Sequence, residues 1–143
     1  MARVRIELPD QFHFSTRIPV RITDLNYGGH VGNDSILTLL HEARVQFLAH
    51  YGYRELDLEG AGLIMADVAI EFRSELFYGE ELIASVRAAE FSKMGFELYY
   101  KLEKQMIDGR LIEVTRAKTG MVCFDYGTKK VTRLPEAALL KLQ

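Results

Sequence analysis

Residues 23–33 read TDLNYGGHVGN and lead directly into the only long apolar helix that the sequence predicts. Asn33 is a residue type that caps helix N-termini, so we expect the helix to begin directly behind it. The first amide groups of a helix have no partners within it, and the helix dipole adds partial positive charge at that end. The sequence therefore predicts a point at which a developing oxyanion can be stabilised.

The same loop brings polar side chains to the predicted start of the helix. Asn26 and His30 are both expected there, and three glycines accompany them. Gly28, Gly29 and Gly32 allow another group, such as a substrate carbonyl, to approach the main chain closely. This composition indicates a reactive site, although the spacing alone also fits a glycine-rich turn with an ordinary helix cap.

The predicted helix extends to about Tyr51, with Gly52 as its C-cap. Apolar residues cover most of its circumference, because residues at helical spacing are joined by others on the flanks. The first set is Ile36, Leu39, Leu40, Ala43 and Phe47, and the second is Leu37, Val45 and Leu48. Other elements are therefore expected to enclose this helix.

Most of the remaining chain is predicted to form strands. Residues 12–22 read as a strand that Pro19 restricts to a sheet edge or a bulge. Residues 64–73 alternate without a break, and the face expected to meet the core carries Ile64, Ala66, Val68, Ile70 and Phe72. Residues 82–88 and 96–102 alternate in the same way.

The C-terminal part contains a strong hairpin signal, Asp108-Gly109, followed by a last long strand over residues 111–126. The alternation of that strand slips between Val114 and Ala117, which indicates a β-bulge. Pro135 is expected to start a short amphipathic helix.

One enclosed helix followed by four long antiparallel strands indicates a single α+β domain over residues 1–143, with a curved sheet wrapped around the helix. Such a sheet has open edges, and several half-apolar positions on its outer face would be costly to leave in water. These positions are Met65, Ala69, Ile83, Ala89 and Tyr99. A homodimer is therefore expected.

Composition argues against several classes of protein. The formal net charge is -2 with both signs interspersed, so neither nucleic acid nor a membrane is indicated as a partner. No stretch approaches the ~20 apolar residues of a membrane span, and charges interrupt residues 1–9, so a cytoplasmic location is expected. Cys123 is the only cysteine and reads as a buried strand residue, and the histidines lack metal-ligand spacing, so neither a disulfide nor a metal is expected.

The chain resembles the hot-dog-fold acyl-CoA thioesterases of the 4-hydroxybenzoyl-CoA thioesterase group. In that group a strand is followed by Asp-x-Asp-x-x-Gly-(His or apolar)-Val-x-Asn and then by a helix carrying Glu-x-Arg. The matching residues are Asp24, Asn26, Gly29, His30, Val31, Asn33 and Glu42-Ala43-Arg44. Residues 70–73 and 76–80 resemble the next strand and turn, so the similarity covers about residues 12–130.

This resemblance implies a hot-dog fold and hydrolysis of an acyl thioester of coenzyme A or of an acyl-carrier protein. Coenzyme A is then part of the substrate, no separate cofactor is implied, and homodimers or dimers of dimers are expected. Lys93 matches a basic turn that contacts the nucleotide in the resembled group. Tyr27 is a candidate for an acyl channel, and Gly29, Gly32 and Asn33 are candidates for contact with the substrate carbonyl.

One position departs from the pattern of the group. The second acidic residue of the loop is the catalytic carboxylate in 4-hydroxybenzoyl-CoA thioesterases, and here it is Asn26. A neutral amide cannot act as a nucleophile or a general base. The arrangement of Asn26 and His30 is closer to other hot-dog thioesterases, including plant acyl-carrier-protein thioesterases, in which a loop asparagine and histidine take part in catalysis.

The expected mechanism is attack on the thioester by an activated water. Amides near Gly32 and Asn33 would bind the carbonyl oxygen, and Asn26 would orient the carbonyl or the water. His30 would take the proton from water at neutral pH.

Three acidic residues have secondary roles in this interpretation. Asp24 either orients His30 or caps the turn. Asp67 is a second candidate for the base, reaching the loop of another copy in a dimer. Glu42 is expected to form an ion pair, with Arg44 or with a strand residue.

Two other functions remain open from the sequence. A hot-dog dehydratase or hydratase would act on 3-hydroxyacyl or enoyl thioesters with a histidine and a helix acid, for which His30 and Glu42 are the nearest pair. A non-catalytic module would bind an acyl thioester without turnover, which the missing carboxylate favours.

Overall fold

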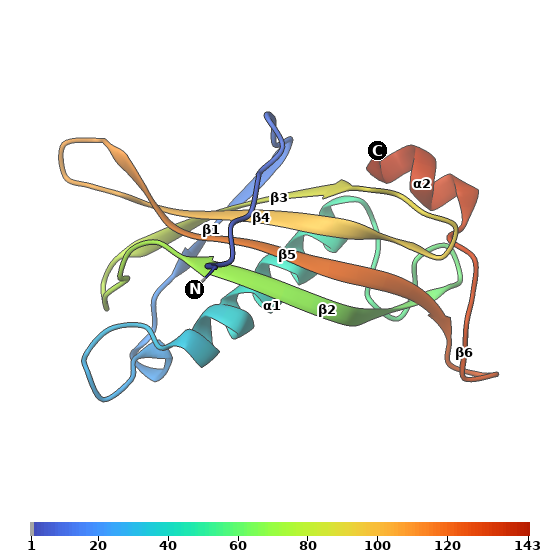
Figure 1. Cartoon of the computed structure of the whole chain (residues 1–143), viewed down its shortest axis with the longest axis horizontal. Coiled ribbons are helices and arrows are strands. Elements are labelled where there is room, and N and C mark those ends of the chain that lie inside the picture. Colours follow the sequence, from blue (N-terminus) through green and yellow to red (C-terminus); the bar gives the residue numbers. More distant parts are fainter. Residues whose placement is uncertain (1) are drawn as a thin grey trace.

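The computed structural model describes residues 2–143, in which a long helix, α1, lies across one face of an antiparallel sheet (Figure 1). The strands are β1 (Phe14–Pro19), β2 (Gly62–Phe72), β3 (Glu81–Ala89), β4 (Gly95–Gln105), β5 (Leu111–Asp125) and β6 (Lys130–Val131). The helices are a short 3-10 turn (Ile22–Asp24), α1 (Asn33–His50) and α2 (Glu136–Leu142). The sheet order is β1-β3-β4-β5-β2, with β6 paired to β5, which confirms the predicted α+β architecture.

The hydrophobic core lies between α1 and the middle of the sheet. The helix buries Leu39, Leu40, Ala43, Phe47 and Leu48 in a cluster that includes Leu82, Leu98, Leu102 and Ala117 of the central strands. Each fully buried leucine or phenylalanine side chain contributes about 1.5–3 kcal/mol, so the cluster anchors the helix to the sheet. Leu37 and Val45 stay exposed, so the expected enclosure of the whole helix is wrong for these flanks.

The N-terminus of α1 differs by one residue from the prediction. The N-cap is Gly32 and Asn33 is the first helical residue, so the capping role expected of Asn33 is wrong. Gly32 is extended, its amide donates to the Asp24 carbonyl at 3.3 Å, and Asp34 Oδ1 lies 2.7 Å from where its Cβ would be. A side chain at this position would require the Asp34 carboxylate to move.

The C-terminus of α1 is as predicted. Tyr51 follows the last helical residue and Gly52 takes a φ of +83°, the left-handed conformation in which glycine commonly ends a helix. Pro135 precedes α2, also as predicted. Within residues 2–143, no helix combines the length and the apolar character that crossing a bilayer requires.

The first edge strand, β1, is shorter than predicted. Its ladder with β3 ends at Pro19, which confirms the expected edge position of this proline. Residues 22–24 leave the strand because they form a 3-10 turn, in which the Arg21 amide donates to the Asp24 carboxylate at 2.8 Å.

The second edge strand, β2, carries a bulge. Its pairing with β5 shifts between Met65 and Asp67, so the predicted unbroken alternation is wrong. Val68 and Phe72, expected to face the core, are 38% and 52% exposed. The reason is that α1 lies nearest to β1 and β3, at the opposite edge of the sheet.

The hairpin between β4 and β5 confirms two predictions. Gly109 takes a φ of +90° in the turn, as the Asp108-Gly109 signal requires. Leu102 pairs with Thr115 and Glu103 with Glu113, so Val114 is the additional residue of a bulge.

A polar chain runs beneath α1. The buried Arg44 side chain donates to Glu55 at 2.5 Å and to the Tyr100 hydroxyl at 3.3 Å, and the hydroxyls of Tyr100 and Thr119 are 2.8 Å apart. Glu42 is exposed and forms no ion pair within residues 2–143, so its expected pairing is wrong. The partner of Arg44 comes instead from the loop after the helix.

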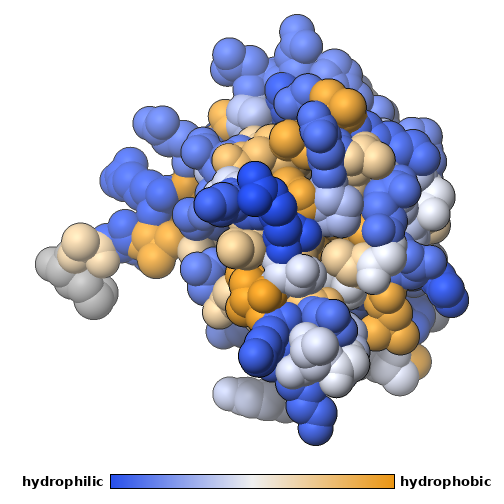
Figure 2. Space-filling view, turned by 90° about the vertical axis from the view of Figure 1, so that its right-hand side faces the viewer, coloured by the Kyte–Doolittle hydropathy of each residue, from blue (hydrophilic) through white to orange (hydrophobic). Residues whose placement is uncertain are grey.

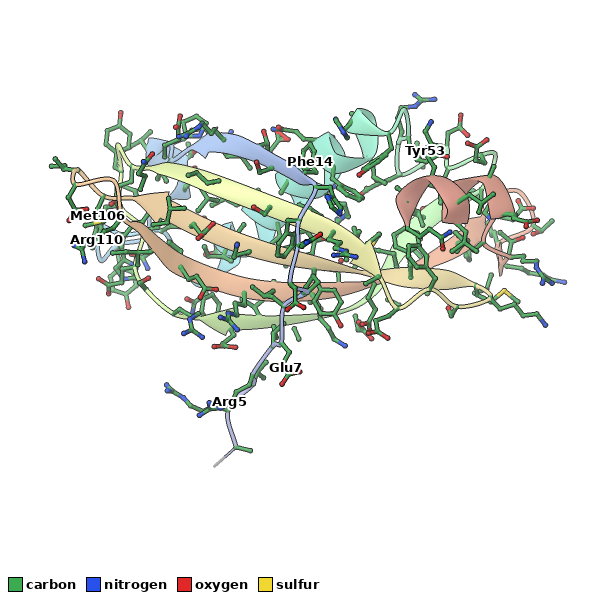
Figure 3. All side chains as sticks on the ribbon, turned by 90° about the horizontal axis from the view of Figure 1, so that it is seen from above. Arg5, Glu7, Phe14, Tyr53, Met106 and Arg110 are labelled. Atoms are coloured by element: carbon green, nitrogen blue, oxygen red, sulfur yellow. The ribbon has the colours of Figure 1, made fainter. Side chains whose placement is uncertain are left out.

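The N-terminal segment crosses the sheet face opposite α1 (Figures 1 and 3). The Ile6 amide donates to Glu71 at 2.9 Å, and Arg116 donates to the Ile6 carbonyl at 3.2 Å. Arg87 donates to the Gln11 carbonyl at 2.8 Å. These bonds from β2, β5 and β3 hold the segment against the outer face.

Candidate active site

The loop before α1 folds into a small hairpin that holds Asn26 opposite His30. The Asn26 amide donates to the His30 carbonyl at 2.8 Å, and the Gly29 amide donates to the Asn26 carbonyl at 3.1 Å. Leu25 and Val31 form an isolated β-bridge at the base of the hairpin. Gly29 takes a φ of +83°, which a residue with a Cβ adopts only under strain.

Within residues 2–143, the side-chain oxygen of Asn26 forms a hydrogen bond and its side-chain nitrogen forms none. Its Oδ1 accepts a hydrogen bond from the Gly28 amide at 2.8 Å, as in an Asx turn. Its Nδ2 lies 3.8 Å from the position that a Cβ on Gly32 would take, and therefore beside the start of α1. Asn26 Oδ1 and His30 Nε2 both flank Gly28, at 3.2 and 3.5 Å from the position of a Cβ there.

The first turn of α1 presents unbonded amide groups. The Ile36 amide donates to the Gly32 carbonyl at 3.1 Å, which is the first bond of the helix. Within residues 2–143, the amides of Asn33, Asp34 and Ser35 donate to no acceptor. Because the Gly32 amide is already used, an oxyanion at this point would be bound by the amides that begin at Asn33.

The imidazole of His30 is half-buried and oriented by its neighbours. Its Nδ1 lies 3.1 Å from the Val31 carbonyl oxygen. A carbonyl only accepts hydrogen bonds, so Nδ1 carries the proton and Nε2 is the basic nitrogen of the neutral ring. Nε2 lies 3.9 Å from Glu75 Oε1. The basic nitrogen therefore faces a carboxylate whose side chain is 63% exposed.

Asp24 has the second of its two predicted roles. It is buried, and its carboxylate accepts hydrogen bonds from the Arg21 amide at 2.8 Å and from the Arg21 guanidinium at 3.2 Å. These bonds occupy the carboxylate within the 3-10 turn. Asp24 thus caps the turn, and the structure does not bring its side chain to His30.

Sequence reasoning missed Glu75, the carboxylate that does lie beside His30. Glu75 belongs to the loop after β2, which reaches the hairpin because the Val31 amide donates to the Leu76 carbonyl at 2.8 Å and His30 bridges to Phe77. The only signal in the sequence was the family-like turn at residues 76–80, which does not identify Glu75.

Asp34 is a second carboxylate that sequence reasoning missed. Its Oδ1 lies next to Gly32 and the free amides of the first helical turn. Negative charge is favourable near a helix N-terminus.

A pocket of about 230 Å³ opens beside His30 and the start of α1. Its walls come from the hairpin, the first turn of α1, the loop after β2 and the β5 bulge. The polar side chains that line it include His30, Asn33, Ser74, Glu75 and Thr115. Thr115 was not predicted as a site residue, because its position reads as an ordinary strand residue within the predicted bulge.

Of the predicted site residues, His30 and Asn33 line this pocket. Asp24, Asn26, Gly29 and Gly32 belong to the same loop but not to the pocket lining, and the remaining three lie elsewhere. Tyr27 is fully exposed at the tip of the hairpin. Asp67 lies in the middle of β2, where its Oδ1 accepts a hydrogen bond from the Gly120 amide at 3.0 Å. Lys93 lies in the turn between β3 and β4, at the end of the sheet that also carries α2 (Figure 1). The surface of the molecule at this end is mostly hydrophilic (Figure 2). None of the three contacts His30 within residues 2–143.

Comparisons with known proteins agree with this architecture. A family model described as the thioesterase-like superfamily matches residues 20–142. The structure of 4-hydroxybenzoyl-CoA thioesterase from Pseudomonas sp. strain CBS-3 is similar with a TM-score of 0.78 at 16% identity, over 90% of this chain and 97% of that chain. A comparison with curated proteins found no match.

Two further solved structures have the same fold. A 1,4-dihydroxy-2-naphthoyl-CoA thioesterase from Synechocystis has a TM-score of 0.77 at 20% identity, over 90% of this chain and 94% of that chain. A thioesterase from Thermus thermophilus, complexed with coenzyme A and Zn, has a TM-score of 0.78 at 20% identity, over 93% and 99% of the two chains. These similarities confirm the predicted hot-dog fold.

Proposed function

Because the chain belongs to the thioesterase-like superfamily and is a thioester hydrolase, we propose that the pocket beside His30 is its active site. The proposed reaction is hydrolysis of an acyl thioester of coenzyme A or of an acyl-carrier protein to a carboxylic acid and a free thiol. One observation carries the proposal: His30, whose Nε2 is the basic ring nitrogen, and Asn33, whose amide is unbonded at the start of α1, line the same pocket. Coenzyme A enters as part of the substrate, and the reaction needs no separate cofactor.

The amides of Asn33, Asp34 and Ser35 are the proposed oxyanion site. When water attacks the thioester carbonyl, negative charge develops on its oxygen, and fixed donors at the helix N-terminus stabilise that charge. The loss of one such donor typically lowers kcat by about 10²–10³-fold. Asn26, whose Nδ2 lies beside the same turn, would orient the carbonyl.

His30 is the proposed general base. Nε2 takes a proton from water as the water oxygen bonds to the carbonyl carbon, which forms a tetrahedral intermediate. When the intermediate collapses, the carbon–sulfur bond breaks and the imidazolium returns the proton to the departing thiolate. The Glu75 carboxylate, 3.9 Å from Nε2, stabilises the imidazolium between the two steps.

We also propose that the protein is a homodimer joined along β2, either alone or within a dimer of dimers. The outer edge of β2 is unpaired in the chain that the structure describes, and Met65, Val68 and Phe72 are exposed on this strand. A second copy that pairs antiparallel with this edge would complete its backbone hydrogen bonds and cover these apolar side chains.

This dimer would bring further predicted residues to the pocket. Antiparallel pairing about a twofold axis places the Gly62 end of one β2 beside the Phe72 end of the other. The pocket lies at the Phe72 end and the Lys93 turn at the opposite end, so Lys93 of a second copy would approach the pocket. Its charge suits a coenzyme A phosphate there. Asp67 would lie at the interface, where it remains the alternative base.

Analytical ultracentrifugation tests the proposed interface. Val68→Lys places a charge on the exposed side of β2 and is expected to shift the protein from dimer to monomer. Val131→Lys is the matched control, because Val131 is also exposed but lies on β6. A monomeric wild type, or dissociation by the control alone, would contradict the interface. We also propose a cytoplasmic location for the protein.

Thiol release from a panel of acyl-CoA esters of different chain length, including benzoyl and phenylacetyl esters, tests the function. Wild type is expected to release thiol, and Asn26→Ala to lower kcat/KM by about 10²-fold without loss of fold. A selective loss in Asp67→Asn would instead assign the base to the second copy. Binding of acyl-CoA without thiol release from any ester would contradict hydrolysis at this site.

A further inference from the structure

The first residues of the described chain, 2–5, form an arm that extends past the edge of the sheet. Figure 3 shows Glu7 beside β2 and Arg5 beyond the outer edge of that strand. Ile6 anchors the arm at its base, because it is 6% exposed and its amide donates to Glu71 at 2.9 Å. Residues 2–5 are exposed and, in the part of the chain that the structure describes, form no hydrogen bond or ion pair. The arm is therefore fixed at one end and points to the side on which the proposed dimer has its second copy.

Two arginines give the arm a positive charge. Arg3 and Arg5 carry it, and Val4 between them is 54% exposed. The arm and residues 70–73 line a hollow of about 570 Å³. Because this hollow separates the arm from its own strand, the side chains of the arm are free to contact an acidic surface on another chain.

A second hollow, of about 340 Å³, is acidic. The charged side chains that line it are Asp67, Glu90 and Glu97. Among the described residues, no basic residue lines it. Glu97 pairs with Lys118 at 2.9 Å, whereas Asp67 and Glu90 form no ion pair within residues 2–143. Two carboxylates are thus available to cations from outside this chain.

The acidic hollow lies on the outer face of the sheet, near the start of β2. Side chains alternate along β5, so Gly120 of the hollow is on the same face as Arg116, which holds the N-terminal segment. Val122, also part of the lining, pairs with Ile64 near the start of β2. In the proposed dimer, this end of one β2 lies beside the Glu71 end of the other, from which the arm extends.

The arm is long enough to reach this hollow on a second copy. Neighbouring strands of a sheet lie about 4.8 Å apart. Beyond the edge of its own β2, the arm would meet β2 of the second copy first and β5 next, at about 10 Å. Four extended residues span about 13 Å. The arm thus crosses the two strands that carry Asp67 and Gly120, and its arginines arrive at the acidic hollow.

We propose that the arm of each copy binds in the acidic hollow on the outer face of the other copy. This inference rests on the proposed dimer along β2. Arg3 and Arg5 pair with the two carboxylates of the second copy that lack a cation, and Val4 contacts the apolar part of the lining, which includes Met94 and Val122. Because a twofold axis relates the copies, each dimer contains this contact twice.

The dissociation constant of the dimer, measured by analytical ultracentrifugation at low and high salt, tests the charges. Arg3→Glu/Arg5→Glu is expected to raise it about tenfold or more at low salt, because attraction at both arms becomes repulsion. The effect should shrink at high salt, which screens exposed charges. Glu90→Lys should weaken the dimer as well, and should weaken it less when combined with Arg3→Glu/Arg5→Glu. Arg17→Glu/Arg110→Glu is the matched control, because these exposed arginines lie on β1 and on the hairpin between β4 and β5.

A cross-link tests which surfaces meet. One chain carries Arg3→Cys and a second chain carries Glu90→Cys. When the two are co-expressed and oxidised with copper–phenanthroline, a disulfide-linked dimer is expected on a non-reducing gel, whereas neither chain expressed alone should form one. The native Cys123 is completely buried and does not compete. Arg110→Cys in place of Arg3→Cys is the control and should give no linked dimer.

The outcomes separate the arm from the dimer itself. A monomeric wild type, or a dimer that Val68→Lys leaves intact, would overturn the proposed interface and the arm contact together. A dimer that Val68→Lys dissociates, but that responds equally to the arm variant and its control or forms no cross-link, would overturn only the arm contact. Thiol release from acyl-CoA by wild type tests hydrolysis independently of both.

Discussion

Glu75 Oε1 lies 3.9 Å from Nε2 of His30, and this contact joins the loop after β2 to the hairpin before α1. Nδ1 of the same ring lies 3.1 Å from the Val31 carbonyl, so both ring nitrogens have a neighbouring oxygen. Both residues line the pocket in which we propose that the reaction takes place.

Replacing His30 and replacing Glu75 are both expected to reduce turnover, and the loss is expected to be larger for His30. His30→Gln removes the base and should lower kcat by about 10²-fold or more, because general base catalysis contributes about 10²–10⁴-fold. Glu75→Gln keeps the base but removes the charge beside it, and should lower kcat about tenfold. The measurement is steady-state hydrolysis of the best acyl-CoA substrate.

His13→Gln is the matched control for the histidine, because His13 is exposed and lies outside the pocket. Glu42→Gln is the control for the glutamate, because Glu42 is exposed on α1. Unchanged turnover in His30→Gln would exclude His30 as the base.

Asn26→Asp is expected to lower activity although it introduces the carboxylate of the resembled group. The Asp side chain can still accept the Gly28 amide bond, now 2.8 Å long. Its second oxygen replaces Nδ2 beside the start of α1, where negative charge competes with an oxyanion for the free amides. We expect kcat/KM to fall about tenfold or more. A higher kcat/KM would show that a carboxylate at this position can act as the catalytic group and would contradict the role given to Asn26.

Arg44→Met is expected to destabilise the fold strongly. It removes the ion pair with Glu55 and the hydrogen bond to the Tyr100 hydroxyl, both beneath α1. The loss of one member of a buried pair commonly costs about 3–5 kcal/mol, and we expect a loss near the lower end because Glu55 is partly exposed. Urea unfolding measures the change in the free energy of unfolding. Glu42→Ala, on the exposed side of the same helix, should change it by less than about 0.5 kcal/mol.

Cys123 is expected to be unreactive in the folded protein. The side chain is completely buried in β5, and burial raises the pKa of its thiol to about 11. At pH 8 only about one thiol in a thousand is then ionised, and the thiolate is the reactive form. A chromogenic disulfide reagent should detect no thiol in the native protein and one per chain after unfolding in guanidinium. Immediate reaction of the native protein would contradict this burial and would also add a background to the thioesterase assay.

Local patterns in the sequence predicted the elements whose structure depends on neighbouring residues. The apolar repeat from Ile36 to Phe47 predicted α1, and Asp108-Gly109 predicted the hairpin between β4 and β5. The phase slip near Val114 predicted the bulge. Helical period, positive φ and strand alternation are properties of a few consecutive residues, so they can be read without knowledge of the fold.

The same patterns failed where the environment of a residue depends on distant parts of the chain. Val68 and Phe72 alternate like core residues, but they lie on an edge strand that α1 does not cover. Asn33 has the character of a cap, but the bond from Gly32 to the Asp24 carbonyl brings the chain into the helix one residue earlier.

The sequence by itself determined the loop, the helix whose first amides are free, and the presence of Asn26 and His30 beside them. Only the tertiary structure decided that Glu75 is the carboxylate next to His30 and that Thr115 is completely buried at the β5 bulge. The physical reason is that both depend on non-local pairing, between the hairpin and the loop after β2 and along the bulged β5 strand. A shift of one residue in that register would turn Thr115 to the other face of the sheet.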